Sequence, residues 1–272
     1  MICVSELNIY PIKSCKGTAL QQAEIGPYGI VGDRALMVTT PDGKFITQRE
    51  LERMALIRPL LGENSSVTLT APDMAELKVR LSREGPRLTG QVWRSTVSVT
   101  DQGEAAAEWL STFLGQPLRL VGPASDFTRK LNPDYARRER DETAFADGYP
   151  VLLISQAALD ELNERLVVKG AEPVPMNRFR PNIVVSGCEA FAEDTWTQIR
   201  IGEVVFDLVK PCPRCPIPTI DQEAGVRTRE PIKTLNEYRR TADGSVMFGQ
   251  NLIHANAGRV QVGDEVEVLG VR

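Results

Sequence analysis

The sequence predicts a β-rich α+β fold with a few helices, built as a small barrel or sandwich of short strands. Three observations lead to this fold class. The 21 glycines and 18 prolines are spread along the 272 residues, which favours many turns over a helical bundle. Short apolar runs are separated by turn residues at close intervals, as in small barrels and sandwiches. Strands and helices also do not alternate as they do in a Rossmann sheet.

The first part of the chain is predicted to consist mainly of strands. The first strand lies within residues 2–12 and ends at Pro11. Further strands are expected at residues 24–25, 34–40, 66–70, 77–81 and 97–100. One helix follows. Asp101 and Glu104 resemble a capping box, Gly115 can end the helix, and an apolar stripe is formed by Ala106, Trp109, Leu110 and Phe113.

Residues 122–148 are polar and interrupted by prolines, and we expect a long surface loop there. The start of this loop is the predicted domain boundary, which gives an N-terminal β-rich domain, residues 1–121, and a second domain, residues 122–272. In the second domain Ser155 is a plausible N-cap for a helix that carries Leu159, Leu162 and Leu166. Strands are expected at residues 150–154, 182–186, 198–201 and 204–209. A C-terminal hairpin is predicted around Gly263-Asp264, flanked by Val260, Val262, Val266 and Val268.

Composition and charge exclude several classes of protein. The formal net charge is −4, whereas a broad nucleic-acid surface normally needs a basic excess, so no nucleic-acid partner is expected. No signal peptide and no apolar run of about eighteen residues is found, so no membrane contact is predicted. Five cysteines, an odd number, do not suggest a disulfide framework. We therefore expect a cytoplasmic protein with reduced thiols.

The cations are more informative than the net charge. Seven of them fall in short segments rich in glycine, proline, asparagine or serine: Lys13, Lys16, Arg34, Arg49, Arg178, Arg180 and Arg214. Cations gathered in the loops of an acidic protein suggest a small anionic ligand, although scattered surface arginines are the simpler alternative. The mixed-charge run at residues 137–142 is interpreted as a solvated face.

The motif Cys212-Pro213-Arg214-Cys215 is the first candidate site. Alone it fits half a zinc site, a redox dithiol or two buried thiols. Structural zinc needs four ligands, and no second closely spaced pair is present. The flanking prolines make the segment stiff, unlike the helix start of a thioredoxin-like dithiol. This rigidity, together with Arg214 beside the thiol, favours a thiolate held for a soft metal.

Three other segments are candidate contacts for an anion. Residues 10–17 present Lys13 and Ser14 where a strand ends. Residues 177–182 combine arginines with Asn182 at a strand entrance. The helix that begins at Ser155 offers free backbone N–H groups. We assign no role to His254, and Trp93, Trp109 and Trp196 are interpreted as packing residues.

Taken together, these motifs resemble the MOSC superfamily, in particular the branch with an N-terminal MOSC barrel that includes the mitochondrial amidoxime-reducing component and its bacterial relatives. The resemblance covers almost the whole chain. It rests on Tyr10-Pro11-Ile12-Lys13-Ser14, Gly32-Asp33-Arg34, the Ser155 helix start, residues 179–187, residues 191–196, Cys212-Pro213-Arg214-Cys215, Thr219-Ile220-Asp221 and Phe248-Gly249-Gln250. It implies a MOSC-type β-barrel preceded by a barrel-like N-terminal domain, with a cofactor pocket shared between the two.

The resemblance also implies a cofactor. In this family a molybdenum ion is bound by a pterin dithiolene (Mo-molybdopterin) and by one cysteine thiolate, which corresponds here to Cys215. The matching cofactor contacts are Lys13, Ser14, Arg34, Ser155, Arg180, Asn182 and Arg214. We expect Lys13, Arg34 and Arg180 to converge on one pocket with the Ser155 helix start. Pro213 departs from the pattern, because relatives commonly carry a hydroxyl residue there.

The implied activity is reduction of small N-hydroxylated compounds, such as hydroxylamines, N-hydroxylated nucleobases or amidoximes, to amines. No cysteines remain for an iron–sulfur cluster, so electrons are expected from a separate reductase, flavodoxin, ferredoxin or cytochrome. The alternative is a molybdenum-cofactor carrier or a sulfur-transfer module that uses Cys215, because MOSC domains also resemble part of the cofactor sulfurases. Binding of pyridoxal phosphate is a further MOSC-type alternative.

Overall fold

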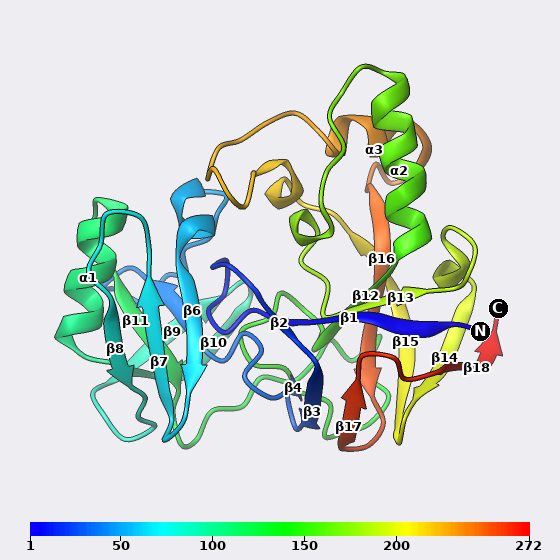
Figure 1. The fold of residues 1–272 in the computed structure, drawn as a ribbon. Helices are drawn as coiled ribbons and strands as arrows, with labels where there is room; N and C mark the ends of the chain where they lie inside the picture. The colour runs from blue at the N-terminus through cyan, green and yellow to red at the C-terminus, as the bar shows by residue number, and fades with distance from the viewer.

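The structure, a computed structural model, describes residues 1–272, and it confirms the β-rich α+β fold class. Eighteen strands form four sheets, and there are three α-helices. The sheets are curled into half-barrels. Figure 1 shows two lobes, which we call the first and the second lobe. The first contains β5 to β11 with α1, and the second contains one large sheet with α2 and α3.

The large sheet has eight strands in the order β18-β14-β15-β16-β12-β13-β1-β2. All neighbours are antiparallel except β12 and β13, which are parallel. Its strands are β1 (Cys3–Ile9), β2 (Thr18–Leu20), β12 (Val151–Ser155), β13 (Ile183–Ser186), β14 (Trp196–Ile201), β15 (Val204–Pro213), β16 (Met247–His254) and β18 (Val266–Val271). The sheet therefore joins the N-terminal strands to the second half of the chain. Its core contains 19 buried residues.

Three smaller sheets complete the β structure. A four-stranded sheet, β5-β11-β10-β9, contains β5 (Met37–Thr39), β9 (Arg87–Val92), β10 (Ser95–Asp101) and β11 (Arg119–Pro123). A meander contains β6 (Arg58–Gly62), β7 (Ser66–Thr70) and β8 (Leu77–Arg80). The third sheet contains β17 (Gly258–Gln261), β3 (Gln22–Gly26) and β4 (Gly29–Ile30). The boundary predicted after residue 121 falls inside β11, and the division into two domains stays a prediction.

The helices are α1 (Glu104–Leu114), α2 (Gln156–Val168) and α3 (Ile232–Tyr238), and none is long and apolar enough to span a membrane. The predicted N-cap of α2 is confirmed, because the Ser155 hydroxyl accepts from the Ala158 N–H at 3.2 Å. Gly115 ends α1 in a left-handed conformation, as predicted. The predicted capping box is wrong. Gly103 is the N-cap, and Asp101 instead accepts from the Gly103 N–H at 2.7 Å.

Three other expectations are wrong. The C-terminal valines do not form a hairpin with each other, since β17 pairs with β3 and β18 pairs with β14. Residues 124–150 contain no helix or strand, but they do not form a surface loop, because Phe127, Arg129 and Phe145 are buried. Nor is the charged run at residues 137–142 simply solvated. Asp141 is buried, and Arg138 forms an ion pair with Asp207 at 2.9 Å.

Candidate cofactor and substrate site

A cavity of about 320 Å³ lies where the two lobes meet. Thr47, Arg49 and Trp93 line it from the first lobe, whereas β15 and the segment before β13 line it from the second. Seven of the eight predicted site residues line this one cavity: Lys13, Ser14, Arg34, Arg180, Asn182, Arg214 and Cys215. The fold therefore brings together side chains that are more than 200 positions apart in sequence.

Ser155 is the predicted residue that does not line the cavity. It is fully buried, its hydroxyl caps α2, and its N–H donates to Glu193 at 3.0 Å. The expected convergence of this helix start with the cations is not found. Ser155 was assigned from the free N–H groups of a helix start and from the resemblance, and its local capping role accounts for the residue type.

The two cysteines of the motif lie at the end of β15. The strand's last pair is Pro213 with Met247, and the Arg214 N–H then donates to the Val246 carbonyl at 2.8 Å. Cys215 therefore follows directly after a fixed strand end, half-buried and facing the cavity. Arg214 donates to the Cys212 sulfur at 3.2 Å, so its guanidinium contacts Cys212, not Cys215 as expected. No cluster of three His, Cys, Asp or Glu side chains is present, and the two thiols that line the cavity are those of Cys212 and Cys215.

Arg34 and Arg180 form a pair of cations in the cavity, with Arg180 buried and Arg34 partly buried. Both guanidinium groups stack on Tyr10, at 4.3 and 4.1 Å from the ring centroid. Arg34 donates to Asp33 at 2.6 Å, and Arg180 donates to the Cys15 carbonyl at 2.6 Å. Burial, and then the charge of Arg34, lowers the pKa of Arg180 to about 10, so the group stays charged at neutral pH. One buried and one partly buried cation beside a single carboxylate, Asp33, favour the binding of an anion.

Asn182 ties three segments together beside these arginines. Its Oδ1 accepts from Arg34 at 2.9 Å and from the Leu152 N–H at 3.1 Å, and its Nδ2 donates to the Asn8 carbonyl at 3.1 Å. The side-chain oxygen is thus fully used, and only one N–H is left for a ligand. The main role of Asn182 in this geometry is therefore to position Arg34.

Strained backbone is concentrated at this cavity. Eight non-glycine residues in the chain have positive φ, and four of them line it: Ser14 (65°), Arg34 (43°), Trp93 (55°) and Arg180 (59°). Such conformations cost about 1–3 kcal/mol each and cluster at functional sites. The strain therefore supports a functional role for this cavity independently of the charges.

Sequence reasoning missed a cluster at the cavity wall. Asp147 forms an ion pair with Lys13 and accepts from the Trp93 indole N–H at 3.1 Å. The Arg49 guanidinium stacks on Trp93 at 4.4 Å from the ring centroid. Partial desolvation opposes it, but the charge and hydrogen bond of Lys13 hold the pKa of Asp147 below its usual range, although the carboxylate side chain is 58% exposed. No local signal marked Asp147, because its partners are 54 and 134 positions away.

Lys16 and Arg178 lie outside the cavity and serve the surrounding structure. Lys16 pairs with Glu223 at 2.5 Å. Arg178 donates to the Pro218 carbonyl at 2.8 Å and to Asp221 at 3.1 Å, which fixes the segment that follows Cys215.

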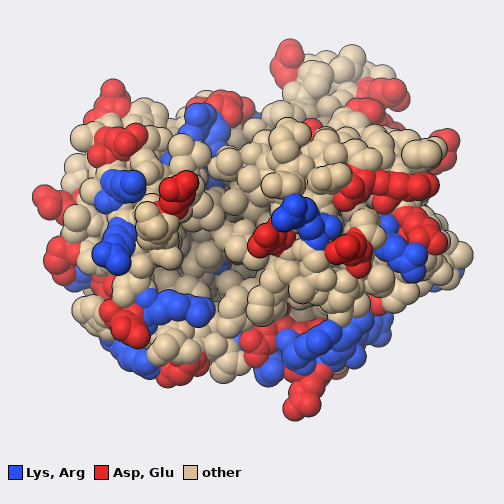
Figure 2. All heavy atoms as spheres, turned by 60° about the horizontal axis from the view of Figure 1, so that its bottom comes forward, with Lys and Arg blue, Asp and Glu red and all other residues tan.

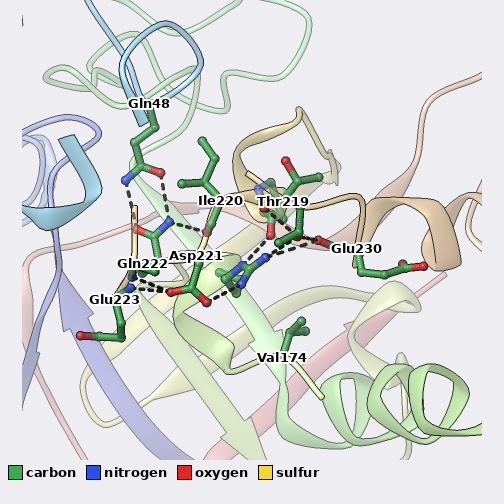
Figure 3. Close-up of polar contacts among 12 residues, drawn as sticks. Gln48, Val174, Thr219, Ile220, Asp221, Gln222, Glu223 and Glu230 are labelled. Atoms are coloured by element: carbon green, nitrogen blue, oxygen red, sulfur yellow. Dashed lines mark hydrogen bonds and ion pairs between the residues drawn. The ribbon is translucent and has the colours of Figure 1, made fainter. Parts of the chain in front are cut away.

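A pair of hydrogen-bonded glutamines connects this segment to the first lobe. Gln48 and Gln222, both buried, exchange hydrogen bonds of 3.0 and 3.1 Å, as Figure 3 shows. Gln48 also donates to the Ser14 carbonyl at 2.8 Å. The two lobes are therefore fixed relative to each other beside the cavity.

The outer surface does not carry a large patch of charge of one sign. On the face in Figure 2, acidic and basic side chains are interspersed around a central hollow. The concentration of cations in the cavity is thus a local feature and does not extend over this face.

Comparisons with known proteins identify the family. The family model described as the MOSC N-terminal beta barrel domain matches residues 1–117, and that of the MOSC domain matches residues 140–267. The chain is 36% identical to mitochondrial amidoxime-reducing component 1 of Mus musculus, over 98% of this chain and 82% of that protein. It is 36% identical to the Xenopus laevis protein of the same name, over 97% of this chain and 81% of that protein. It is 38% identical to mitochondrial amidoxime reducing component 2 of Rattus norvegicus, over 97% and 82%. The chain therefore belongs to the MOSC family of amidoxime-reducing components.

Proposed function

We propose that this protein is a molybdenum-cofactor-dependent oxidoreductase that reduces N-hydroxylated compounds, such as amidoximes, N-hydroxylated nucleobases and hydroxylamines, to amines. The names of the relatives support the substrate class. The observation that carries the proposal is the convergence of a half-buried thiol and five loop cations on one cavity. Those cations are Lys13, Arg34, Arg49, Arg180 and Arg214.

The residues of the cavity fit a pterin cofactor with a terminal phosphate. The five cations face only two carboxylates, Asp33 and Asp147, so a dianion would be stabilised there. The Arg214 Nε is buried without an acceptor, which is costly, and an oxygen-rich ligand would satisfy it. Ser14 also lines the cavity.

The chain's own residues have distinct roles in this proposal. Cys215 is the protein ligand of the metal, and Lys13, Ser14, Arg34, Arg180 and Arg214 hold the cofactor. Asn182 positions Arg34 through its side-chain oxygen. The bound cofactor would supply two-electron redox chemistry at molybdenum.

The reaction consumes two electrons and two protons, converts N–OH to N–H and releases water. Asp147 stays ionised at neutral pH because its pKa is lowered, so it does not donate either proton. The free cysteines do not form a cluster-binding group, and we propose that a separate protein supplies the electrons.

Metal analysis combined with an activity assay tests this function. Protein purified from a host that makes the cofactor should contain about one molybdenum per chain and should reduce acetamidoxime with reduced viologen. Cys215→Ser should abolish turnover, since it replaces a soft ligand with a hard one. Cys188→Ser is the matched control, because Cys188 packs against the core of the large sheet, outside the cavity.

The same experiment distinguishes an enzyme from the alternative functions. Protein that binds molybdenum but is inert with every N-hydroxylated compound and reductant would favour a cofactor carrier or a sulfur-transfer module. Protein without molybdenum after expression with the cofactor would contradict both readings.

A further inference from the structure

The cavity has an outer extension that no step of the proposed function uses. A more open hollow of about 680 Å³ adjoins it, between the β9–β10 turn and residues 129–133. Four residues line both spaces: Trp93, Asp147, Gly148 and Tyr149. Two of the four are aromatic. A compound that passes from solvent through the hollow toward Cys215 therefore meets both rings.

Trp93 is held in an unfavourable position. It is the first residue of the two-residue turn between β9 and β10 and has φ 55°, where glycine is normally preferred. Trp93 is 45% exposed, although indoles are normally largely buried. The hydrogen bond to Asp147, the stacking of Arg49 and a tilted contact with Phe45, at 5.3 Å between ring centroids, fix the ring in this place. The turn thus maintains a partly exposed, oriented indole at the cavity mouth.

Tyr149 provides the second aromatic side chain from the other lobe. It is half-buried, packs edge-on against Tyr135 at 5.9 Å between ring centroids, and its hydroxyl makes no hydrogen bond within the chain. Burial, and then the nearby Tyr135 and Asp134, raises the pKa of Tyr149 to about 12, so the phenol keeps its proton. An uncharged ring with a free O–H can stack on a flat ligand and donate a hydrogen bond to it.

We infer that Trp93 and Tyr149 form a subsite for the substrate, and that this subsite selects planar, π-conjugated N-hydroxylated compounds over small aliphatic ones. The inference rests on the proposed function. Stacking on an aromatic side chain stabilises a bound ring by about 0.5–1.5 kcal/mol, which corresponds to about 2- to 12-fold in affinity. The exposed indole is the principal source of this selectivity.

Two amidoximes that share the reacting group test the inference. Benzamidoxime carries a phenyl ring, and acetamidoxime carries a methyl group instead. Trp93→Leu and Trp93→Phe both remove the hydrogen bond to Asp147, but only the first removes the aromatic ring. We expect Trp93→Leu to lower the kcat/KM ratio of benzamidoxime to acetamidoxime about 3- to 10-fold, and Trp93→Phe to restore most of that ratio. Equal losses for both substrates in Trp93→Leu would assign Trp93 a structural role and overturn the inference.

A binding measurement distinguishes failure of the subsite from failure of the proposed function. Trp109 and Trp196 are buried, so quenching of tryptophan fluorescence by benzamidoxime reports mainly on Trp93. We expect saturable quenching that is weaker with acetamidoxime and is weakened about 3-fold or more by Tyr149→Leu. Quenching without any turnover would refute only the proposed function. Turnover without saturable quenching, and with an unchanged substrate ratio in Trp93→Leu, would refute only the subsite.

Discussion

Arg180→Met should separate anion binding from protein stability. Burial, and then the charge of Arg34, lowers the pKa of Arg180 from its ordinary value to about 10, which corresponds to a cost of about 3 kcal/mol for keeping the buried group charged. This cost is fully present at neutral pH, because neutral pH lies below the folded-state value, and it is relieved only as the pH rises through about 10. Replacement by an uncharged side chain of similar length removes the cost.

The same substitution also removes favourable contacts. The hydrogen bond to the Cys15 carbonyl is a charge-assisted one, worth about 1.5–3 kcal/mol, and stacking on Tyr10 adds about 0.5–2 kcal/mol. Losses and gains nearly cancel, so the free energy of unfolding should change by at most about 2 kcal/mol. The Tm of the cofactor-free protein should then shift by at most about 8 °C.

Phosphate binding should respond much more strongly. The contact removed from a bound anion is charge-assisted, and its loss should weaken the affinity for inorganic phosphate about 10- to 100-fold. Isothermal titration of the cofactor-free protein measures this without any activity assay. Arg178→Met is the matched control. It should lower the Tm more, because it leaves Asp221 and the Pro218 carbonyl unpaired, and it should leave phosphate affinity nearly unchanged. A large drop in Tm for Arg180→Met with unchanged phosphate affinity would refute this reasoning.

Three further predictions concern the metal, the electrons and the fold. Cys215→Ala should abolish reductase activity and alter the absorption spectrum of the metal. Cys212→Ser should keep bound molybdenum and much of the activity. Equal loss of activity in both folded variants would contradict the proposal of a single cysteine ligand. NADH alone should give no steady turnover, while reduced viologen or an added reductase should, and sustained oxidation of NADH by the pure protein would contradict an external electron supply. Asn182→Leu should lower the free energy of unfolding by about 2–4 kcal/mol in denaturant titrations, because it leaves the Leu152 N–H and the Asn8 carbonyl unpaired. A change below about 0.5 kcal/mol would show that water replaces these hydrogen bonds.

Local signals predicted local structure well. The strand expected at residues 66–70 is β7, because alternating burial there follows from sequence alone. The Ser155 cap and the Gly115 end were also predictable, since each depends on residues within one helical turn. Which strands pair with each other in the sheets could not be predicted in the same way. The Gly263-Asp264 turn is real, but Val262 continues toward Gln21 and β17 pairs with β3, a contact across more than 230 residues.

The candidate site shows the same division between local and long-range information. The sequence shows that these cations lie in loops, but it does not show which of them are paired with carboxylates in the folded protein. Lys16 and Arg178 each acquire a carboxylate of their own, Glu223 and Asp221, and so contribute little to the cavity.

Arg34 and Arg180, in contrast, share Asp33 and stack on the same ring. The anion site is therefore created by an imbalance in tertiary pairing rather than by the number of cations. A variant that gives Arg180 its own carboxylate should remove phosphate binding even though every arginine is retained. The Cys15 side chain is fully buried in an apolar cluster, close enough to Arg180 for that charge to act on its thiol, so Cys15→Asp is the substitution to test. If folded Cys15→Asp protein still binds phosphate as tightly as the wild type, the charge imbalance does not determine the site.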